Sequence, residues 1–187
     1  RVLIVGCGYV GLPLGAELVK LGHEVVGLRR SAGGDADLKA AGLTPLHADI
    51  TQPETLAALP TGFDWVVNCA ASGGGDADAY RRLYLHGTRN LIEWLWGSRG
   101  RESADSSKGG DVRRLMSAAT IKKFVYTSST GVYGQNDGSV VKESSPTEPA
   151  TETAKVLAET EKVLLAAARE KNFPAVVLRV AGIYGPD

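Results

Sequence analysis

Short apolar runs alternate along this chain with longer segments in which apolar residues recur every three or four positions. The runs have the length of β-strands that are buried on both faces, and the longer segments have the spacing of amphipathic helices. Strands are expected at Val2–Val5, Glu24–Leu28, Leu43–His47, Trp65–Asn68, Lys123–Thr127 and Ala175–Leu178. This alternation predicts an α/β fold of Rossmann type, a doubly wound parallel sheet with helices on both faces.

The helical spacing is clear directly after the first strand. A helix is predicted from Tyr9 to Leu21, with Leu14 and Leu18 on the same face as Leu21, and Gly22 ends it. Further helices are expected to end at Gly42, to begin near Pro53, and to cover Ala77–Trp96 and Thr151–Arg169. Each predicted helix therefore connects two predicted strands, as a parallel sheet requires.

Residues 97–120 break this alternation. They are rich in Ser, Gly and charged residues without periodicity, which predicts a mobile surface insertion. At 187 residues the chain suits a single domain that buries about 70% of its unfolded surface.

Composition narrows the class of protein. The chain is 43% apolar and 22% charged, and 21 basic residues balance 21 acidic ones. A net charge of zero gives no long-range attraction to nucleic acid or to a membrane surface. We find no apolar stretch of transmembrane length and no signal peptide, and expect a cytoplasmic protein, with a homodimer as a possible assembly.

Cysteine and histidine positions bear on redox and metal chemistry. Cys7 and Cys69 each follow a predicted strand, and we expect reduced, semi-buried thiols rather than a disulfide. The three histidines, His23, His47 and His86, show no ligand spacing with each other or with the cysteines. No metal site is therefore predicted.

The first turn carries the strongest chemical signal. Gly6, Gly8 and Gly11 have the G-x-G-x-x-G spacing between an apolar strand and a helix that begins near Tyr9 and Val10. The first glycine permits a tight turn, the second leaves room for a pyrophosphate, and the third lets the helix pack close to the strand. The helix N-terminus then supplies amides and a dipole that favour an anion. The alternative is a tight turn that binds no ligand.

The second strand runs into Arg29, Arg30 and Ser31. NAD sites commonly have an acidic residue here, which accepts hydrogen bonds from the adenosine ribose, whereas NADP sites have Arg nearby. Two guanidinium groups and a hydroxyl suit a 2′-phosphate, because guanidinium binds phosphate oxygens as a fork. We therefore predict NADP in preference to NAD. The alternative is a solvated basic turn.

Residues with candidate binding or catalytic chemistry follow each of the six predicted strands. In doubly wound parallel sheets, ligands bind outside the carboxyl ends of the strands. We therefore expect these residues to line one crevice.

Several motifs together resemble the extended short-chain dehydrogenase/reductases of the NAD-dependent epimerase/dehydratase family. The most specific is the Ser-rich segment Tyr126–Gly134, YTSSTGVYG, which joins an apolar strand to Val-Tyr-Gly. The others are the glycine motif, Asp49, Asn68–Ala71, Gly87–Leu91 and Leu178–Pro186. The resemblance covers nearly the whole chain and implies one NAD(P)-binding Rossmann domain over residues 1–187.

The resemblance also implies roles for individual residues. At the adenosine end, Asp49 would hydrogen-bond the adenine amino group and Ile50 would pack beside the base. The small turn residues Cys69, Ala70 and Ala71 would let the backbone approach the cofactor ribose. In the catalytic half, Ser129 would orient a substrate carbonyl and Lys155 would hold the nicotinamide ribose, the alternative for Lys155 being an exposed helix lysine.

Three positions depart from the family pattern. Val5 occupies the first position of the usual G-x-x-G-x-x-G, with Gly6 displaced beside it. Tyr84 replaces the asparagine expected three residues before Gly87. Thr151 replaces the catalytic tyrosine expected four residues before Lys155. Together the three departures resemble an atypical branch of the family that lacks the standard active-site tyrosine.

The replacement at position 151 bears most on mechanism. Thr151 and Lys155 are expected on one helix face, one turn apart. A lysine ammonium lowers the pKa of a neighbouring phenol from about 10, but a threonine hydroxyl is a far weaker acid. Slow or absent alcohol oxidation is expected. Tyr133 or Tyr184 at the crevice rim is a candidate substitute, the alternative for each being a structural role. Proton transfer through water from Glu152 is a further option.

Two functions from different classes follow. The first is an atypical NAD(P)-dependent oxidoreductase that moves hydride at a carbinol or carbonyl carbon, of a nucleotide sugar for example. The second is a non-catalytic NADP(H)-binding sensor or scaffold. A similar glycine turn opens the nucleotide-sugar dehydrogenases, but Arg29 and Arg30 and the lack of a catalytic cysteine segment disfavour that class.

The resemblance also bears on completeness. Family members continue beyond the Tyr-Gly-Pro turn into a smaller, substrate-binding lobe, whereas this sequence starts with Arg and stops at Asp187. We expect a fragment, or further residues outside this sequence.

Overall fold

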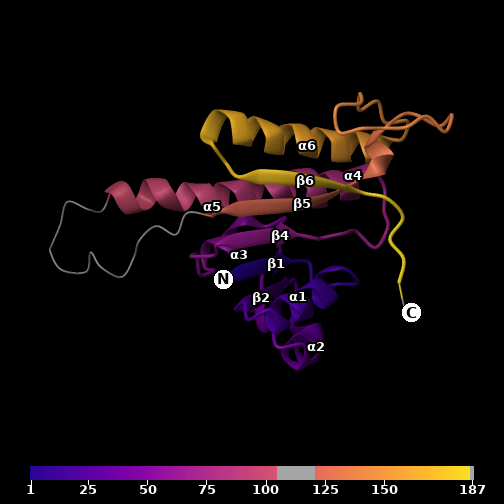
Figure 1. Cartoon of the computed structure of the whole chain (residues 1–187). Helices are drawn as coiled ribbons and strands as arrows, with labels where there is room; N and C mark the ends of the chain where they lie inside the picture. The colour runs from indigo at the N-terminus through magenta and orange to yellow at the C-terminus, as the bar shows by residue number, and fades with distance from the viewer. Residues whose placement is uncertain (105–120, 186–187) are drawn as a thin grey trace, which may run out of the picture.

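A single parallel sheet organises the chain. The computed structural model describes residues 1–104 and 121–185, and its six strands lie in the order β3-β2-β1-β4-β5-β6, all parallel (Figure 1). The strands are β1 Val2–Val5, β2 Val25–Arg29, β3 Thr44–His47, β4 Trp65–Asn68, β5 Lys123–Ser129 and β6 Ala175–Val180. The predicted Rossmann-type sheet is confirmed.

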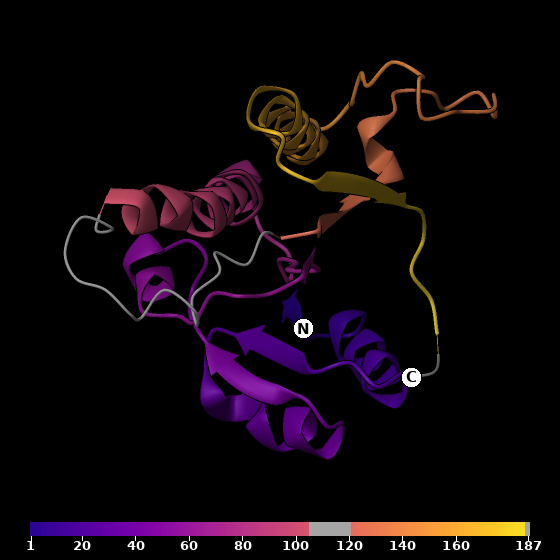
Figure 2. The same cartoon turned by 60° about the vertical axis from the view of Figure 1, so that its left-hand side comes forward.

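Helices cover both faces of this sheet. The principal ones are α1 Gly11–Lys20, α2 Asp35–Ala40, α3 Pro53–Ala57, α5 Gly87–Ala104 and α6 Glu152–Lys171. Helices α1 and α2 pack on one face, and α3, α5 and α6 pack on the other (Figures 1 and 2). The alternation of side chains along β1 explains the two layers: Leu3 and Val5 belong to the core under α5, whereas Val2 and Ile4 belong to the core under α1.

The central strand β1 lies between β2 and β4, and the chain order reverses across it. Val5 is in register with Leu28 of β2 on one side and with Asn68 of β4 on the other. This is the topological switch point at which doubly wound sheets form a ligand crevice. The carboxyl end of β1 is therefore where the site is expected.

The long helix predicted over Ala77–Trp96 has an internal irregularity. It begins as α4, Ala77–Tyr80, passes through a π-helical segment, Arg81–His86, and continues as α5 to Ala104. Residues 97–104 of the predicted insertion are thus helical, while 105–120 lie outside the described residues. No helix within residues 1–104 and 121–185 is long and apolar enough to cross a membrane.

Candidate functional site

A cavity of about 1380 Å³ runs along the carboxyl ends of all six strands. This exceeds the roughly 300–1,000 Å³ of most small-molecule pockets, as an extended dinucleotide would require. Its wall includes Gly6, Gly8, Tyr9, Val10, Arg29, Arg30, Ser31, Asp49, Ile50, Cys69, Ala70, Ala71 and Ser129. The segments that sequence reasoning selected after each strand therefore meet in one crevice.

The three glycines of the first turn play different parts. Gly6 has φ +86°, and a Cβ there would lie 2.5 Å from the Cα of Ala70. A Cβ on Gly11 would lie 2.3 Å from the carbonyl oxygen of Gly6, so α1 packs directly on the turn. A Cβ on Gly8 would meet no heavy atom within 4 Å. Gly6 and Gly11 are required by the fold, whereas Gly8 leaves a gap that faces the cavity.

The N-terminus of α1 opens onto this gap. Val10, the residue that precedes the helix, makes no side-chain hydrogen bond to the amides of the first turn. Uncapped helix amides carry a partial positive charge and bind phosphate groups readily. Gly8 and the start of α1 thus form a cradle that fits a pyrophosphate.

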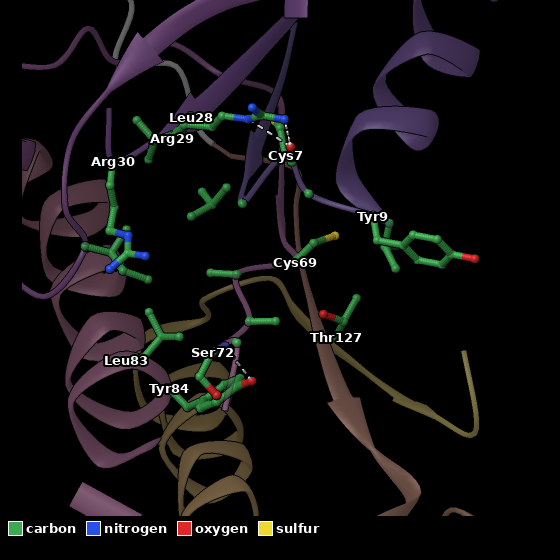
Figure 3. A pocket seen from close by; sticks show the side chains of 18 of the residues that line it. Cys7, Tyr9, Leu28, Arg29, Arg30, Cys69, Ser72, Leu83, Tyr84 and Thr127 are labelled. Atoms are coloured by element: carbon green, nitrogen blue, oxygen red, sulfur yellow. Dashed lines mark hydrogen bonds between the residues drawn. The ribbon is translucent and has the colours of Figure 1, made fainter. Parts of the chain in front are cut away.

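The two arginines after β2 differ in what they bind. Arg29 is half-buried and donates from both Nε and Nη2 to the carbonyl oxygen of Cys7, the Nε bond measuring 2.9 Å. Arg30 is exposed, lines the cavity, and forms no hydrogen bond or ion pair with any described residue. Figure 3 shows the two guanidinium groups pointing apart. Both arginines were expected to bind a 2′-phosphate, but Arg29 already has a partner within the protein.

The turn after β3 holds Asp49 and Ile50 in place. One carboxylate oxygen of Asp49 accepts hydrogen bonds from the amide (2.9 Å) and the hydroxyl (2.8 Å) of Thr51. Ile50 is buried, and Asn90 of α5 donates to its carbonyl oxygen at 2.9 Å. The absence of a side chain at Gly87 makes room for Ile50, because a Cβ there would lie 2.8 Å from it.

The turn after β4 is shaped by Asn68 and Tyr84. The side-chain oxygen of Asn68 accepts a hydrogen bond from Ala70 N at 3.1 Å, and the amide of Ser72 donates to the Tyr84 hydroxyl at 3.2 Å. The Ser72 hydroxyl oxygen is buried and has no partner among the described residues. No site role was expected for Tyr84, although its place in the sequence, where the family has an asparagine, is a signal that indicates the site.

Ser129 is the last residue of β5 and faces the cavity. Its hydroxyl oxygen accepts a hydrogen bond from Gly131 N at 3.0 Å and so caps the short 3₁₀ turn Thr130–Val132. Thr127, two residues earlier on the same side of the strand, also lines the cavity. The predicted strand ended at Thr127, so its extension by two residues places Ser129 at the rim of the sheet.

Thr151 and Lys155 lie outside the cavity wall. Thr151 was predicted to begin the helix, but its backbone is extended (φ −105°, ψ 152°) and it is the N-cap of α6. Its hydroxyl oxygen accepts a hydrogen bond from Ala154 N at 3.2 Å. Lys155 is exposed, and its ammonium binds Glu152 at 2.6 Å. Thr151 thus lies one turn before Lys155, as expected, and Lys155 N donates to its carbonyl oxygen at 3.0 Å, but the two side chains have separate partners.

The three candidate substitute proton carriers, Tyr133, Tyr184 and Glu152, differ in their hydrogen bonding and exposure. The Tyr133 hydroxyl donates to the carbonyl oxygen of Lys142 at 2.9 Å and accepts from Arg179 Nη1 at 2.7 Å, so both of its roles are occupied. Tyr184 lines the cavity but is 93% exposed. Glu152, as noted, is paired with Lys155.

A buried ion pair supports the end of β5. Glu161 of α6 is 2% exposed, binds Arg179 of β6 through both carboxylate oxygens, and accepts a hydrogen bond from the Ser128 hydroxyl at 2.6 Å. Arg179 also lies over the ring of Tyr133, 4.8 Å from its centroid. The Glu161 carboxylate raises the pKa of Arg179 further above its usual range. This network fixes the strand end that carries Ser129.

Both cysteines are free thiols, Cys7 buried and Cys69 half-buried. Burial raises the pKa of each thiol to about 11. Within residues 1–104 and 121–185, no group of three His, Cys, Asp or Glu side chains is arranged to hold a metal ion.

Comparisons with known proteins agree with this geometry. Residues 2–187 match the NAD dependent epimerase/dehydratase family. Protein YeeZ of Escherichia coli (strain K12) is 28% identical over 194 residues, covering all of this chain and 60% of YeeZ.

Two solved structures share the fold. One, from Methylobacillus flagellatus and assigned to the NAD-dependent epimerases/dehydratases, is 34% identical with a TM-score of 0.71, and the match covers all of this chain and 55% of that one. The other is the dTDP-glucose 4,6-dehydratase DesIV of Streptomyces venezuelae with NAD bound. It is 25% identical with a TM-score of 0.78, and the match covers all of this chain and 57% of DesIV. This chain thus spans between half and two thirds of the length of these relatives.

Proposed function

The chain belongs to the NAD-dependent epimerase/dehydratase family, and from this premise we propose that it binds NADP and transfers hydride between the nicotinamide ring and a carbon that bears a hydroxyl or carbonyl group. The observation that carries the proposal is the cradle formed by Gly8 and the uncapped start of α1, in the middle of a cavity that crosses all six strand ends. We place this activity in the cytoplasm, where free thiols such as Cys7 and Cys69 stay reduced.

The wall of the cavity fits the parts of a dinucleotide in order. The pyrophosphate would lie on the amides at the start of α1. The adenosine would extend toward β2 and β3, where Asp49 offers an acceptor for the adenine amino group and Ile50 offers an apolar surface. The nicotinamide half would extend toward β4 and β5, along the small residues Ala70 and Ala71.

Preference for NADP rests on Arg30 and Ser31. Arg30 presents an exposed guanidinium to the cavity without a partner among the described residues, and Ser31 adds a hydroxyl beside it. A 2′-phosphate would satisfy both groups through charge-assisted hydrogen bonds. Arg29 contributes positive charge to the same turn, but its hydrogen bonds to Cys7 make it chiefly a support for the glycine turn.

The proposed chemistry uses Ser129 to orient the substrate oxygen. When bound, the reduced cofactor supplies a hydride to the carbonyl carbon. Ser129 faces the cavity beside this region and can donate a hydrogen bond to the carbonyl oxygen, since its own oxygen accepts from Gly131. A nucleotide sugar is the substrate class we propose, in keeping with the family and with the activity named for DesIV. A role for Lys155 at the nicotinamide ribose would require its ammonium to leave Glu152.

A non-catalytic NADP(H) sensor or scaffold is the second candidate. The observation that favours it is the arrangement at Thr151, whose hydroxyl caps α6 instead of facing the cavity. In this alternative the cofactor binds but no substrate is turned over.

Two measurements on the purified chain separate these functions. Isothermal titration with NADP⁺, NADPH and NAD⁺ tests the cofactor site, and tighter binding of NADP⁺ than of NAD⁺ is expected. Absorbance of NADPH at 340 nm, followed with dTDP- and UDP-linked keto sugars and simple ketones, then tests turnover. Binding with turnover supports the oxidoreductase, binding without turnover supports the sensor, and failure to bind any of the three nucleotides contradicts both.

A further inference from the structure

Tyr84 occupies an irregular turn at the cavity wall. It lies in the π-helical segment Arg81–His86, which interrupts an otherwise α-helical stretch between Tyr80 and Gly87. Such single π-helical turns re-aim side chains and are frequent at functional sites. Tyr84 is half-buried, and Figure 3 shows its hydroxyl beside Ser72 at the turn that follows β4.

The hydrogen bonding of Tyr84 leaves one proton to donate. Its oxygen accepts from the amide of Ser72 at 3.2 Å, and the hydroxyl proton goes to no described residue. The Ser72 hydroxyl oxygen beside it is buried and likewise has no partner among the residues described. Buried polar groups without partners are rare, and a partnerless Ser72 hydroxyl beside an unused Tyr84 proton indicates that a ligand oxygen completes the set.

Tyr84 lies on the β4 and β5 side of the cavity. Its neighbour Arg81 binds Glu159 of α6 at 2.7 Å, which holds the π-helical turn against α6. Tyr126 of β5 lies near Tyr84: burial is the largest cause of the raised pKa of Tyr126, and the charge interaction with Tyr84 is the second. Arg30 and Asp49, at the adenosine end, follow strands on the opposite side of β1. Tyr84 therefore lines the half of the cavity assigned to the nicotinamide.

Other hydroxyl groups are less suited to deliver a proton there. Within the described part of the chain, three tyrosines line the cavity: Tyr9, Tyr84 and Tyr184. Tyr9 lies on the glycine turn and is 57% exposed, and Tyr184 is 93% exposed. Thr151 and Tyr133 are outside the cavity wall and hydrogen-bonded within the protein.

We infer that Tyr84 is the proton donor of the site and takes the chemical role that the family gives to the tyrosine missing at position 151. The inference rests on the proposed function. As hydride reaches the carbonyl carbon, the phenol O–H bond breaks and a new O–H bond forms on the substrate oxygen, which converts the ketone to an alcohol. The resulting phenolate is stabilised by the Ser72 amide and recovers its proton from solvent.

The ionisation of Tyr84 tests this inference without a substrate. The surrounding titratable groups are Arg82, which lines the cavity, Tyr126, and Tyr80, whose ring lies 4.9 Å from that of Tyr84. The oxidised nicotinamide is cationic and the reduced ring is neutral. A cation within a few ångströms lowers the pKa of a phenol by about one unit or more.

The experiment is an NMR titration of the chain labelled with ¹³C at the tyrosine ζ carbon, with saturating NADP⁺ or NADPH. Tyr84→Phe assigns the Tyr84 signal, and Tyr80→Phe is the matched control, because it removes a stacked neighbour outside the cavity wall. We expect the Tyr84 signal to titrate about one unit lower with NADP⁺ than with NADPH, and to do so equally in Tyr80→Phe.

The outcomes separate the inference from the function on which it rests. If both nucleotides bind but the Tyr84 titration is the same with each, Tyr84 does not face the nicotinamide and the inference is overturned alone. If the shifted signal persists in Tyr84→Phe, another tyrosine faces the ring, and the inference is again overturned. If neither nucleotide binds, the proposed function fails and the inference fails with it.

Discussion

The guanidinium of Arg29 donates two hydrogen bonds to the carbonyl oxygen of Cys7 and so ties the end of β2 to the glycine turn (Figure 3). The contact depends on Gly34, because a Cβ there would overlap Nη1 of Arg29. The two arginines after β2 consequently have separable roles, Arg29 supporting the turn and Arg30 facing the cavity.

Substitutions at these two positions should separate turn shape from phosphate recognition. Arg30→Ala removes a free guanidinium from the cavity, and we expect it to weaken NADP⁺ binding by about 10- to 100-fold while NAD⁺ binding changes little. Arg29→Ala frees the glycine turn, so affinity for both nucleotides should fall by similar factors. Isothermal titration of each variant with each nucleotide measures the ratio. Equal effects of Arg30→Ala on the two nucleotides would refute 2′-phosphate recognition by Arg30.

The glycine turn allows a second comparison. Gly6→Ala forces a side chain into a positive-φ position 2.5 Å from the Cα of Ala70, so the melting temperature should fall by several degrees, with weaker nucleotide binding as a consequence. A Cβ on Gly8 would have no heavy atom of residues 1–104 or 121–185 within 4 Å. Gly8→Ala should therefore leave the melting temperature nearly unchanged and still weaken binding about tenfold or more, because the methyl group occupies the pyrophosphate cradle. Differential scanning fluorimetry and titration together check the pair, and unchanged affinity in Gly8→Ala would contradict the cradle.

Thr151 is expected to matter for stability more than for chemistry. Thr151→Ala removes the acceptor for Ala154 N and should lower the free energy of unfolding by about 1 kcal/mol. Thr151→Ser keeps the hydroxyl and serves as the control. Denaturation in urea compares the three proteins. An Ala variant as stable as the wild type would show that the cap contributes nothing.

Loss of the buried ion pair of Glu161 and Arg179 should destabilise the fold more than loss of the partly exposed pair of Arg81 and Glu159. Glu161→Ala leaves the half-buried Arg179 and the buried Ser128 hydroxyl without their acceptor, and should lower the free energy of unfolding by about 3–5 kcal/mol. The partly exposed pair of Arg81 and Glu159 is the comparison, and Arg81→Ala should cost about 1 kcal/mol or less. Urea denaturation of both variants measures the difference. Similar losses in the two would show that burial does not set the strength of these pairs.

The cavity thiol should react slowly at neutral pH. Burial raises the pKa of Cys69 to about 11, and only the thiolate is nucleophilic, so at pH 8 about one thousandth of this thiol is reactive. Alkylation by iodoacetamide should therefore accelerate about tenfold per pH unit from pH 8 to 10. Mass spectrometry of the modified peptide measures the rate, with Cys69→Ser as the control. A rate that levels off near pH 8.5 would mean that the thiol is not buried.

The sequence alone was sufficient to predict the six strands, their parallel direction and a crevice at their carboxyl ends. These features depend on local spacing, because apolar runs of four or five residues, helical periodicity and the glycines at positions 6, 8 and 11 each constrain the backbone nearby. The main helical difference was α5, which continues beyond Trp96 to Ala104.

Tertiary packing decided which partners the side chains of the site contact. Arg29 and Arg30 are adjacent in sequence, yet only the packing of Gly34 and the glycine turn decides that one binds Cys7 and the other faces the cavity. Whether Thr151 begins α6 or caps it depends on a one-residue difference in where the helix starts. Tyr84 lies in a π-helical turn, and its hydroxyl accepts a hydrogen bond from the amide of Ser72. Sequence spacing determines which residues come after each strand, but the direction of each side chain is set by contacts between segments far apart in the chain.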